Sequence, residues 1–187
     1  MSTPVILTFD LATTSGWCCG DGASSPDLGH VTMPSTPTKK GYQELGAFMD
    51  FWDAWVTKHL DRLQPTVVGF EAPLVPQPKY NPVTRKVTQS TSMQTMRKLY
   101  ALPSILEMHC HRRGIECSEV NLKSVKARLA GKGNADKADM VAMARRCGMR
   151  PKTHDEADAF GIWLYALRYY APQHQQAWDK KLYSGLV

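Results

Sequence analysis

The sequence lacks long apolar runs and any basic segment ahead of its first apolar stretch. No apolar run approaches the roughly 18 residues that a membrane-spanning helix needs, so an integral membrane protein is not expected. The N-terminus, MSTPVILTFD, reaches an acid after one short apolar run and does not resemble a signal peptide. We therefore expect a soluble protein of the cytoplasm.

The sequence also has few cysteines, and none of them are spaced for metal binding or for a disulfide framework. There are 5, an odd number, and no C-x-x-C pair occurs. Secreted scaffolds and structural zinc sites normally carry paired or regularly spaced cysteines. Reduced thiols without a shared role are the expectation here.

Acidic residues are scarce in the middle of the chain. The segment from Lys79 to Lys152 contains 16 Lys and Arg but 5 Asp and Glu, whereas the whole chain has a formal charge of +6. The remainder of the chain is therefore acidic. Such an asymmetric distribution favours a polyanionic partner, most often nucleic acid, although a merely solvated basic surface has the same composition.

Periodicity and turn signals predict a single α/β domain with a mixed five-stranded sheet flanked by helices. The segments Val5–Phe9, SGWCCGDG and DLGHVTM predict a three-strand antiparallel meander. Two further strands, expected to be parallel, are at Val67–Phe70 and Ile115–Val120. We expect the domain to fill residues 1–187, with a core of about 5–170 and a polar tail over 172–187.

Apolar residues at spacings of three and four predict the helices. They are expected at 45–63, 92–113, 122–129 and 137–147. A last helix is expected to begin at Thr153, because Thr153 and Glu156 have the spacing of a capping box. The proline-rich and basic stretch 73–89 is predicted to be an irregular loop, and long loops of this kind are usually functional or disordered.

Four carboxylates occur where this fold would bring them together. Asp10 and Glu71 each follow a buried strand that ends in Phe, and Asp155 and Asp158 are three residues apart on the last helix. If the two strands are neighbours, their ends converge, and the helix could present its acids to the same point. Each acid alone has an ordinary explanation as a solvated residue, or, for Asp155, as a favourable charge in a first helical turn.

Four converging carboxylates require positive charge between them. Oxygen ligands favour Mg²⁺ or Mn²⁺ over zinc. Two such ions about 4 Å apart suit phosphodiester hydrolysis, and the basic segment suits an anionic substrate. The residues therefore predict a metal-dependent nuclease.

The ordered motifs FDLATTSGW, GFEAP, KSVKARLAGKGNADKADM and HDEADAFGIW resemble RuvC-type Holliday-junction resolvases, bacterial or phage, of the ribonuclease H-like superfamily. The resemblance extends from about Val5 to Tyr170. It implies a ribonuclease H-like fold and a homodimer that binds a four-way DNA junction and cuts two strands symmetrically. It also implies that Asp10, Glu71, Asp155 and Asp158 bind Mg²⁺, with Mn²⁺ as a substitute, and catalyse the cut.

The resemblance further implies DNA contacts after Glu71 and around VKARLAGKGNADK. The candidates are Lys79, Tyr80, Arg85, Lys86, Lys123, Lys126, Arg128, Lys132 and Lys137. Tyr80 is also a candidate for an aromatic wedge in the junction, and His154 for an assisting group beside the acids. Glu156 is expected to point away. LATTSGW and the long proline-rich loop depart from the cellular resolvases, which leaves junction preference open.

Three alternatives remain at this point. The protein could be a broader debranching nuclease, or a relative that binds DNA without cutting it. DLATTSGW also resembles the phosphate loop of actin-like ATPases and sugar kinases, but these enzymes need about twice this length and a second phosphate loop. No nucleotide cofactor is therefore expected.

Overall fold

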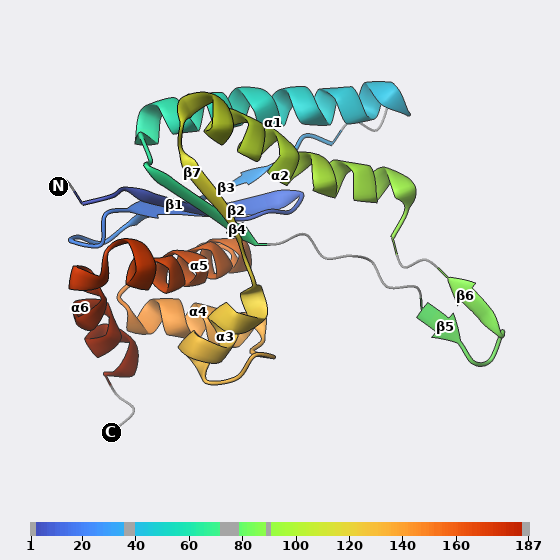
Figure 1. Cartoon of the computed structure of the whole chain (residues 1–187). Coiled ribbons are helices and arrows are strands. Elements are labelled where there is room, and N and C mark those ends of the chain that lie inside the picture. Colours follow the sequence, from blue (N-terminus) through green and yellow to red (C-terminus); the bar gives the residue numbers. More distant parts are fainter. Residues whose placement is uncertain (1–2, 36–39, 72–78, 89–90, 185–187) are drawn as a thin grey trace.

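The computed structural model describes residues 3–35, 40–71, 79–88 and 91–184, and a five-stranded sheet lies at its centre between two layers of helices (Figure 1). The strands are β1 (Ile6–Asp10), β2 (Thr14–Gly20), β3 (Asp27–Thr32), β4 (Val67–Glu71) and β7 (Glu116–Val120). Their order is β3-β2-β1-β4-β7, with the first three antiparallel and the last three parallel. This is the predicted mixed sheet, with β1 at its centre.

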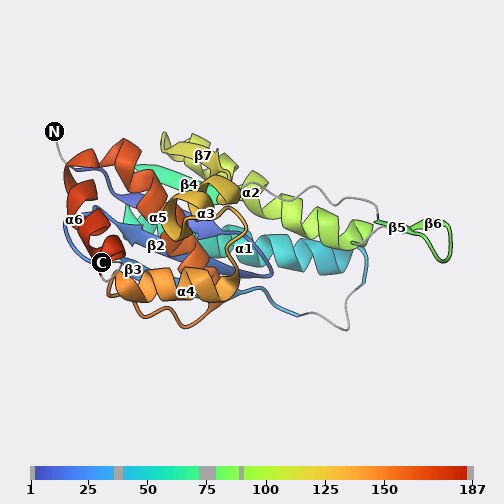
Figure 2. The same ribbon diagram turned by 90° about the horizontal axis from the view of Figure 1, so that it is seen from below.

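The helices follow the predicted order. They are α1 (Tyr42–Leu63), α2 (Met93–Arg113), α3 (Leu122–Ala130), α4 (Lys137–Arg146), α5 (His154–Tyr170) and α6 (Pro172–Tyr183). Figures 1 and 2 show α1 and α2 together on one face of the sheet, and α3 to α6 on the other. No helix in the described ranges is long and apolar enough to cross a membrane.

The face under α1 and α2 is an apolar core. Phe9 and Phe70, the residues just before the two strand-terminal acids, are both buried there. Trp52 of α1 is fully buried against Phe9 and donates its indole hydrogen to the carbonyl of Leu102 on α2, at 2.9 Å. Burial of these aromatic rings helps to hold the two helices to the sheet.

The opposite face is covered by α5, which α3, α4 and α6 in turn enclose. The prediction of a polar tail after Pro172 was wrong for residues 172–183, which form α6. Trp178 and Leu182 of this helix are buried, and the Trp178 indole donates to the carbonyl of Gly22 at 2.9 Å. Two apolar residues four apart were too few to predict the helix from periodicity.

The sequence predicted an irregular loop over the basic segment after β4, and this prediction was wrong for residues 79–88. The segment contains a small antiparallel hairpin, β5 (Lys79–Asn81) and β6 (Lys86–Thr88), which lies away from the sheet near the start of α2 (Figure 1). Its turn uses Arg85 in a left-handed conformation, with φ of 51°. Strands of three residues are too short to show an alternating pattern. Pro73 lies outside the described residues.

Candidate active site

Asp10 and Glu71 lie side by side at one edge of the sheet. They end β1 and β4, which pair in parallel with Phe9 opposite Phe70. Parallel neighbours end at the same edge, so the register alone places both carboxyls together. The Asp10 carboxyl donates a hydrogen bond to that of Glu71. The prediction that the two strand ends converge is therefore confirmed.

The helix α5 brings Asp155 and Asp158 to the same edge. Gly16 of β2 permits this approach, because a Cβ there would lie 2.0 Å from the carbonyl oxygen of Asp155. One turn further on, the Thr8 hydroxyl donates to the carbonyl of Ala159 at 2.8 Å. These contacts fix the first two turns of α5 against the centre of the sheet.

Asp158 is buried and incompletely bonded. Its side chain is in the protein interior, with a residue exposure of 5%, and its Oδ1 atom has no hydrogen-bond partner. An unpaired carboxylate oxygen in such a place is costly unless a cation or donor meets it. Asp158 is therefore the acid of the group whose environment is least complete within the protein itself.

Burial and neighbouring negative charge raise the pKa values of three of these carboxyls, those of Asp10, Glu71 and Asp158. The pKa of Asp10 is raised to about 8, first by burial and then by the negative charges of Glu71 and of the two α5 acids. Burial is also the largest cause that raises the pKa of Glu71 and of Asp158. Without added positive charge, this edge of the sheet therefore holds at least one proton near neutral pH.

Three basic side chains act in the opposite direction. Lys126 of α3 lowers the pKa of both Glu71 and Asp158. Lys137 of α4 and His154 at the start of α5 also lower the pKa of Asp158. Two lysines predicted as DNA contacts are thus near the acids, so an anion that they bind would lie beside the carboxylates.

Glu156 lies apart from this group. Its residue exposure is 2%, and its Oε1 atom is 2.7 Å from Nδ1 of His30 on β3. Its Oε2 atom accepts from the backbone amide of Lys152 at 2.5 Å, while Thr153 caps the helix by accepting from the Glu156 amide. The predicted capping box is therefore half formed. Glu156 instead connects the start of α5 to β3.

The donor set suits a hard divalent cation. Asp10, Glu71, Asp155 and Asp158 offer carboxylate oxygens and no soft ligand, and the orphaned Oδ1 of Asp158 lacks the partner that a cation would provide. In the described ranges, however, no three Asp, Glu, His or Cys side chains already form a group that could hold a metal ion. The carboxylates would have to move closer together around an ion.

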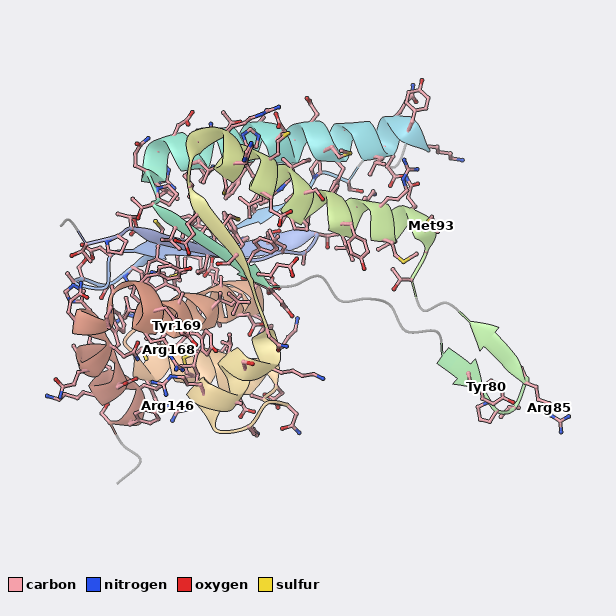
Figure 3. The ribbon with its side chains drawn as sticks, viewed as in Figure 1. Tyr80, Arg85, Met93, Arg146, Arg168 and Tyr169 are labelled. Carbon is pink, nitrogen blue, oxygen red and sulfur yellow. The ribbon has the colours of Figure 1, made fainter. Side chains whose placement is uncertain are left out.

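The remaining predicted DNA contacts are spread over two regions. On α3 and the loop after it, Lys123 is exposed, Arg128 is 3.5 Å from Asp179, and Lys132 is 2.7 Å from Asp139. On the hairpin, Tyr80 is 62% exposed and Arg85 projects outward, far from α5 (Figure 3). The side chains of Lys79 and Lys86 lie outside the described part.

The sequence analysis missed a cluster of tyrosines at the far end of α5. Tyr165, Tyr169 and Tyr170 line a pocket of about 370 Å³ together with residues of β7 and α3. Tyrosines four apart, with Arg168 between them in the run LYALRYY, were the available signal. The run was instead included in the apolar pattern of the last helix.

Comparison with known proteins supports the fold. No protein-family model and no curated protein matches the sequence. Thermus thermophilus RuvC matches in structure with a TM-score of 0.58 and 20% identity, over 97% of this chain and 96% of that chain. The same protein in complex with a Holliday junction substrate gives a TM-score of 0.64 and 19% identity, over 92% and 97%. This chain has the fold of RuvC.

A second protein of known structure supports the same assignment. The yeast mitochondrial Holliday junction resolvase matches with a TM-score of 0.52 and 14% identity, over 98% of this chain and 82% of that chain. The RuvC-type fold predicted from the ordered motifs is therefore confirmed. In this RuvC-type fold the sheet edge at β1 and β4 bears Asp10 and Glu71, and α5 adds the other two acids.

Proposed function

We propose that this protein is a Mg²⁺-dependent endonuclease that resolves four-way DNA junctions by phosphodiester hydrolysis. The observation that carries the proposal is the group of mutually repelling carboxyls at one sheet edge, with the unpaired Oδ1 of Asp158 among them and Lys126 beside them. Buried acids with raised pKa values are typical of sites that bind cations or transfer protons. The RuvC-type fold agrees with this chemistry.

The four acids are proposed as the metal ligands. Asp10, Glu71, Asp155 and Asp158 would hold Mg²⁺, or Mn²⁺ in its place. Ions held there would lower the pKa of an attacking water and would neutralise charge on the leaving 3′ oxygen. Before binding, the Asp10 carboxyl holds a proton against Glu71, and this proton must leave for both groups to become ligands.

The lysines near the acids are proposed to bind and orient the phosphate that is cut. Lys126 and Lys137 come from different helices but both act on the charge of Asp158. A phosphate between them would lie beside the carboxylates without direct contact between like charges. Lys123, Arg128 and Lys132 would contact neighbouring phosphates, with Arg128 and Lys132 exchanging their ion pairs to Asp179 and Asp139 for the DNA.

Branched DNA is proposed as the substrate because a protein of the same fold, RuvC, has been solved in complex with a Holliday junction. The β5–β6 hairpin, with its exposed Tyr80 and Arg85, is proposed as a second DNA contact. It lies at the end of the molecule farthest from α6 (Figure 3). A contact so far from the acids would sense the shape of the DNA rather than the bond that is cut.

A homodimer is proposed, since two strands must be cut to resolve a junction and the described residues of each chain provide one such group of acids. Trp52 cannot form the dimer contact, because it is fully buried within its own subunit. Met93 and Tyr100 of α2 and Met49 and Phe51 of α1 are exposed. Sedimentation analysis at micromolar concentration is expected to give twice the chain mass of 20.9 kDa.

The test is cleavage of a synthetic four-way junction with Mg²⁺. We expect paired cuts by the wild type and a rate at least about 100-fold lower for Asp158→Asn, since even the outer partners of metal ligands are worth 10–100-fold. Asp50→Asn, an exposed residue of α1, is the matched control. Absence of cleavage in both Mg²⁺ and Mn²⁺, or equal rates for the two variants, would contradict the proposal.

The same assay separates the alternatives. Equal cleavage of flaps, forks and junctions would identify a general debranching nuclease. Junction binding without cutting would identify a DNA-binding protein that has lost the chemistry. DNA binding should weaken steeply with salt. The logarithm of the binding constant should fall with the logarithm of the salt concentration, with a slope of about one per neutralised phosphate.

A further inference from the structure

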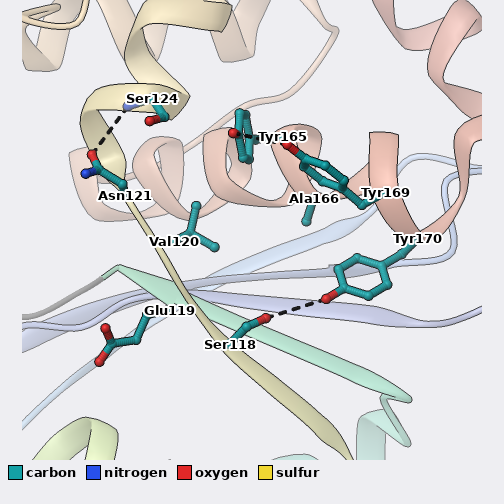
Figure 4. Close-up of a pocket in the computed structure, with 9 residues that line it drawn as sticks. All are labelled: Ser118, Glu119, Val120, Asn121, Ser124, Tyr165, Ala166, Tyr169 and Tyr170. Carbon is teal, nitrogen blue, oxygen red and sulfur yellow. Dashed lines mark hydrogen bonds between the residues drawn. The ribbon is translucent and has the colours of Figure 1, made fainter.

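A pocket of about 370 Å³ lies beside the acid group, between β7, α3 and α5 (Figure 4). Its floor is Ser118 and Val120 of β7, and one wall is Tyr165 and Tyr169 of α5. Pockets that enclose small molecules begin at about 300 Å³. The volume is therefore sufficient for a small planar group with some solvent.

One end of the pocket, at Val120, is next to the proposed catalytic site, and the tyrosines lie farther along α5. Val120 is paired with Glu71 in the parallel ladder between β4 and β7, so one strand spacing of about 4.8 Å separates their backbones. Tyr165 follows Asp158 by seven residues on α5, which places it on the same side of the helix about 10 Å along the axis. This is about three nucleotide rises of B-DNA.

The pocket has aromatic side chains, and an arginine that does not line the pocket lies over their rings. The rings of Tyr165 and Tyr169 are 5.7 Å apart with an interplanar angle of 60°, and Tyr169 is 58% exposed. The guanidinium of Arg168 is 5.5 Å from the first ring and 4.7 Å from the second. The charges of Arg168 and Arg128 also act on the Tyr165 hydroxyl, lowering its pKa against the larger effects of its bond to Tyr169 and of burial.

The polar groups of the pocket are mostly neutral, although the Tyr170 hydroxyl donates to the carboxylate of Glu116 at 2.7 Å. Figure 4 shows Glu119 on the opposite side of β7, turned away from the tyrosines, as alternation along a strand requires. Asn121 uses its side-chain oxygen to cap α3, by accepting from the amides of Lys123 and Ser124. Its NH₂ group, the Ser124 hydroxyl and the tyrosine hydroxyls belong to the same pocket.

We propose that this pocket, the tyrosine pocket, binds one unpaired nucleotide within about three positions of the phosphate that is cut. The inference rests on the proposed nuclease function and names a subsite for it. Aromatic faces combined with arginine are the usual platform for unstacked bases, whereas a paired and stacked base has no free face to offer. Strand separation near the crossover of a junction would supply such a nucleotide beside Glu71.

The first test is photocrosslinking. Junctions that carry 5-iodouracil at single positions one to four nucleotides on each side of the mapped cut, held with Ca²⁺ to prevent cleavage, are irradiated with the wild-type protein. We expect one position to crosslink, and mass spectrometry to find the adduct in residues 165–170. A single-stranded oligonucleotide with one 5-iodouracil is irradiated in parallel and is expected to label the same residues.

The second test measures stacking. An abasic nucleotide at the crosslinking position should weaken wild-type binding about 10-fold, the typical value of one base stacked on an aromatic ring. Tyr169→Leu should bind intact and abasic junctions equally, while Tyr165→Phe, which keeps the ring, should still discriminate. Tyr42→Leu, at a residue 81% exposed on α1, is the control and should behave as the wild type.

The outcomes distinguish the two proposals. Metal-dependent cutting with no adduct in residues 165–170, or with full discrimination in Tyr169→Leu, would overturn the tyrosine pocket and leave the nuclease in place. An adduct there on single-stranded DNA, without any cutting of junctions, would support the pocket and overturn the nuclease. Failure of both cutting and crosslinking would overturn both.

Discussion

The two faces of the sheet are held in different ways. On one face, α5 has 11 of its 17 residues buried and is joined directly to the strands, by Thr8 to Ala159 and by the Trp163 indole to the carbonyl of Gly20 at 3.2 Å. On the other face, α1 has 5 of its 22 residues buried, and the Trp52 indole bonds to α2 rather than to the sheet.

The α5 face positions two of the four acids, whereas the α1 and α2 face mainly stabilises the fold. A helix that carries two of the four acids must hold its distance from the sheet closely, because a shift of about 1 Å in a reacting group is costly. Directional hydrogen bonds and the close contact at Gly16 provide this on the α5 face. The α1 and α2 face contributes apolar burial, which is less directional. Changes on the two faces should therefore affect activity and stability in different proportions.

The largest effect is expected for Gly16→Ala. The new Cβ would be 2.0 Å from the carbonyl oxygen of Asp155, so α5 has to move away from β2. We expect a loss of about 3 kcal/mol in the free energy of unfolding, measured by urea denaturation, and loss of the stabilisation by Mg²⁺. Gly46→Ala on α1, where nothing lies within 4 Å, should instead gain about 0.5–1 kcal/mol. Equal midpoints for both variants would contradict the close contact.

A smaller effect is expected for Glu156→Gln. The change weakens the bonds to His30 and to the Lys152 amide, so the start of α5 is less firmly fixed to β3. We expect the free energy of unfolding to fall by about 1.5–3 kcal/mol. In the junction assay, the Mg²⁺ concentration that gives half-maximal cleavage should be about 10-fold higher. Glu44→Gln, which weakens a partly buried pair with Lys98 on the other face, should lower the free energy of unfolding by less than Glu156→Gln does and leave the Mg²⁺ requirement unchanged. A stability loss with an unchanged Mg²⁺ requirement would mean that Glu156 has no positioning role.

Asp10→Asn is expected to stabilise the metal-free protein in a pH-dependent way. The folded pKa of about 8 is above the unfolded value of 3.8, so the folded chain binds more protons between these values and wild-type stability falls as pH rises through this window. Asparagine does not titrate. The variant's advantage should be absent below pH 4, grow to pH 8 and then level off at about 1–2 kcal/mol.

Thermal denaturation in a chelator at pH 5, 7 and 9 measures this advantage. Addition of Mg²⁺ should stabilise the wild type but not Asp10→Asn, because the variant lacks one of the ligands. Asp50→Asn on α1 should show no such pH dependence. An advantage that shrinks as pH rises would contradict the raised pKa.

The smallest effect is expected for Ile105→Val on the α2 face. Ile105 is buried in the apolar core with an exposure of 8%, and loss of one methylene costs about 1 kcal/mol. Because α1 and α2 carry none of the four proposed metal ligands, cleavage per folded molecule should remain that of the wild type. A loss of activity larger than the loss of folded protein would show that the α1 and α2 face also positions the acids.

The sequence alone predicted the local elements and their order. Alternation and apolar runs located β1, β2, β3, β4 and β7, and spacings of three and four located α1 to α5 within a few residues. The position of Asp10 after Phe9 and of Glu71 after Phe70 then required only that the two strands be parallel neighbours. Burial patterns repeat within a few residues, so they can be recognised without knowledge of distant contacts.

Short or sparsely apolar elements could not be recognised in this way. The β5 and β6 strands have three residues each, and α6 shows two buried residues four apart. Both depend on partners elsewhere for their stability, since isolated helices and hairpins of this size are marginal. For the same reason, the sequence predicted a polar tail over residues 172–183, whose helix depends on the contact of Trp178 with Trp163 of α5.

The amino-acid sequence by itself determined the strands, the helices and the identity of four acids that follow or begin them. Tertiary structure decided which groups meet. Glu156 bonds to His30, 126 residues away, rather than joining the acids, and Asp158 acquires its unpaired oxygen from burial. The tyrosine pocket likewise needs β7, α3 and α5 together. Local pattern encodes burial, but pKa values and cavities arise from distances between residues far apart in the chain.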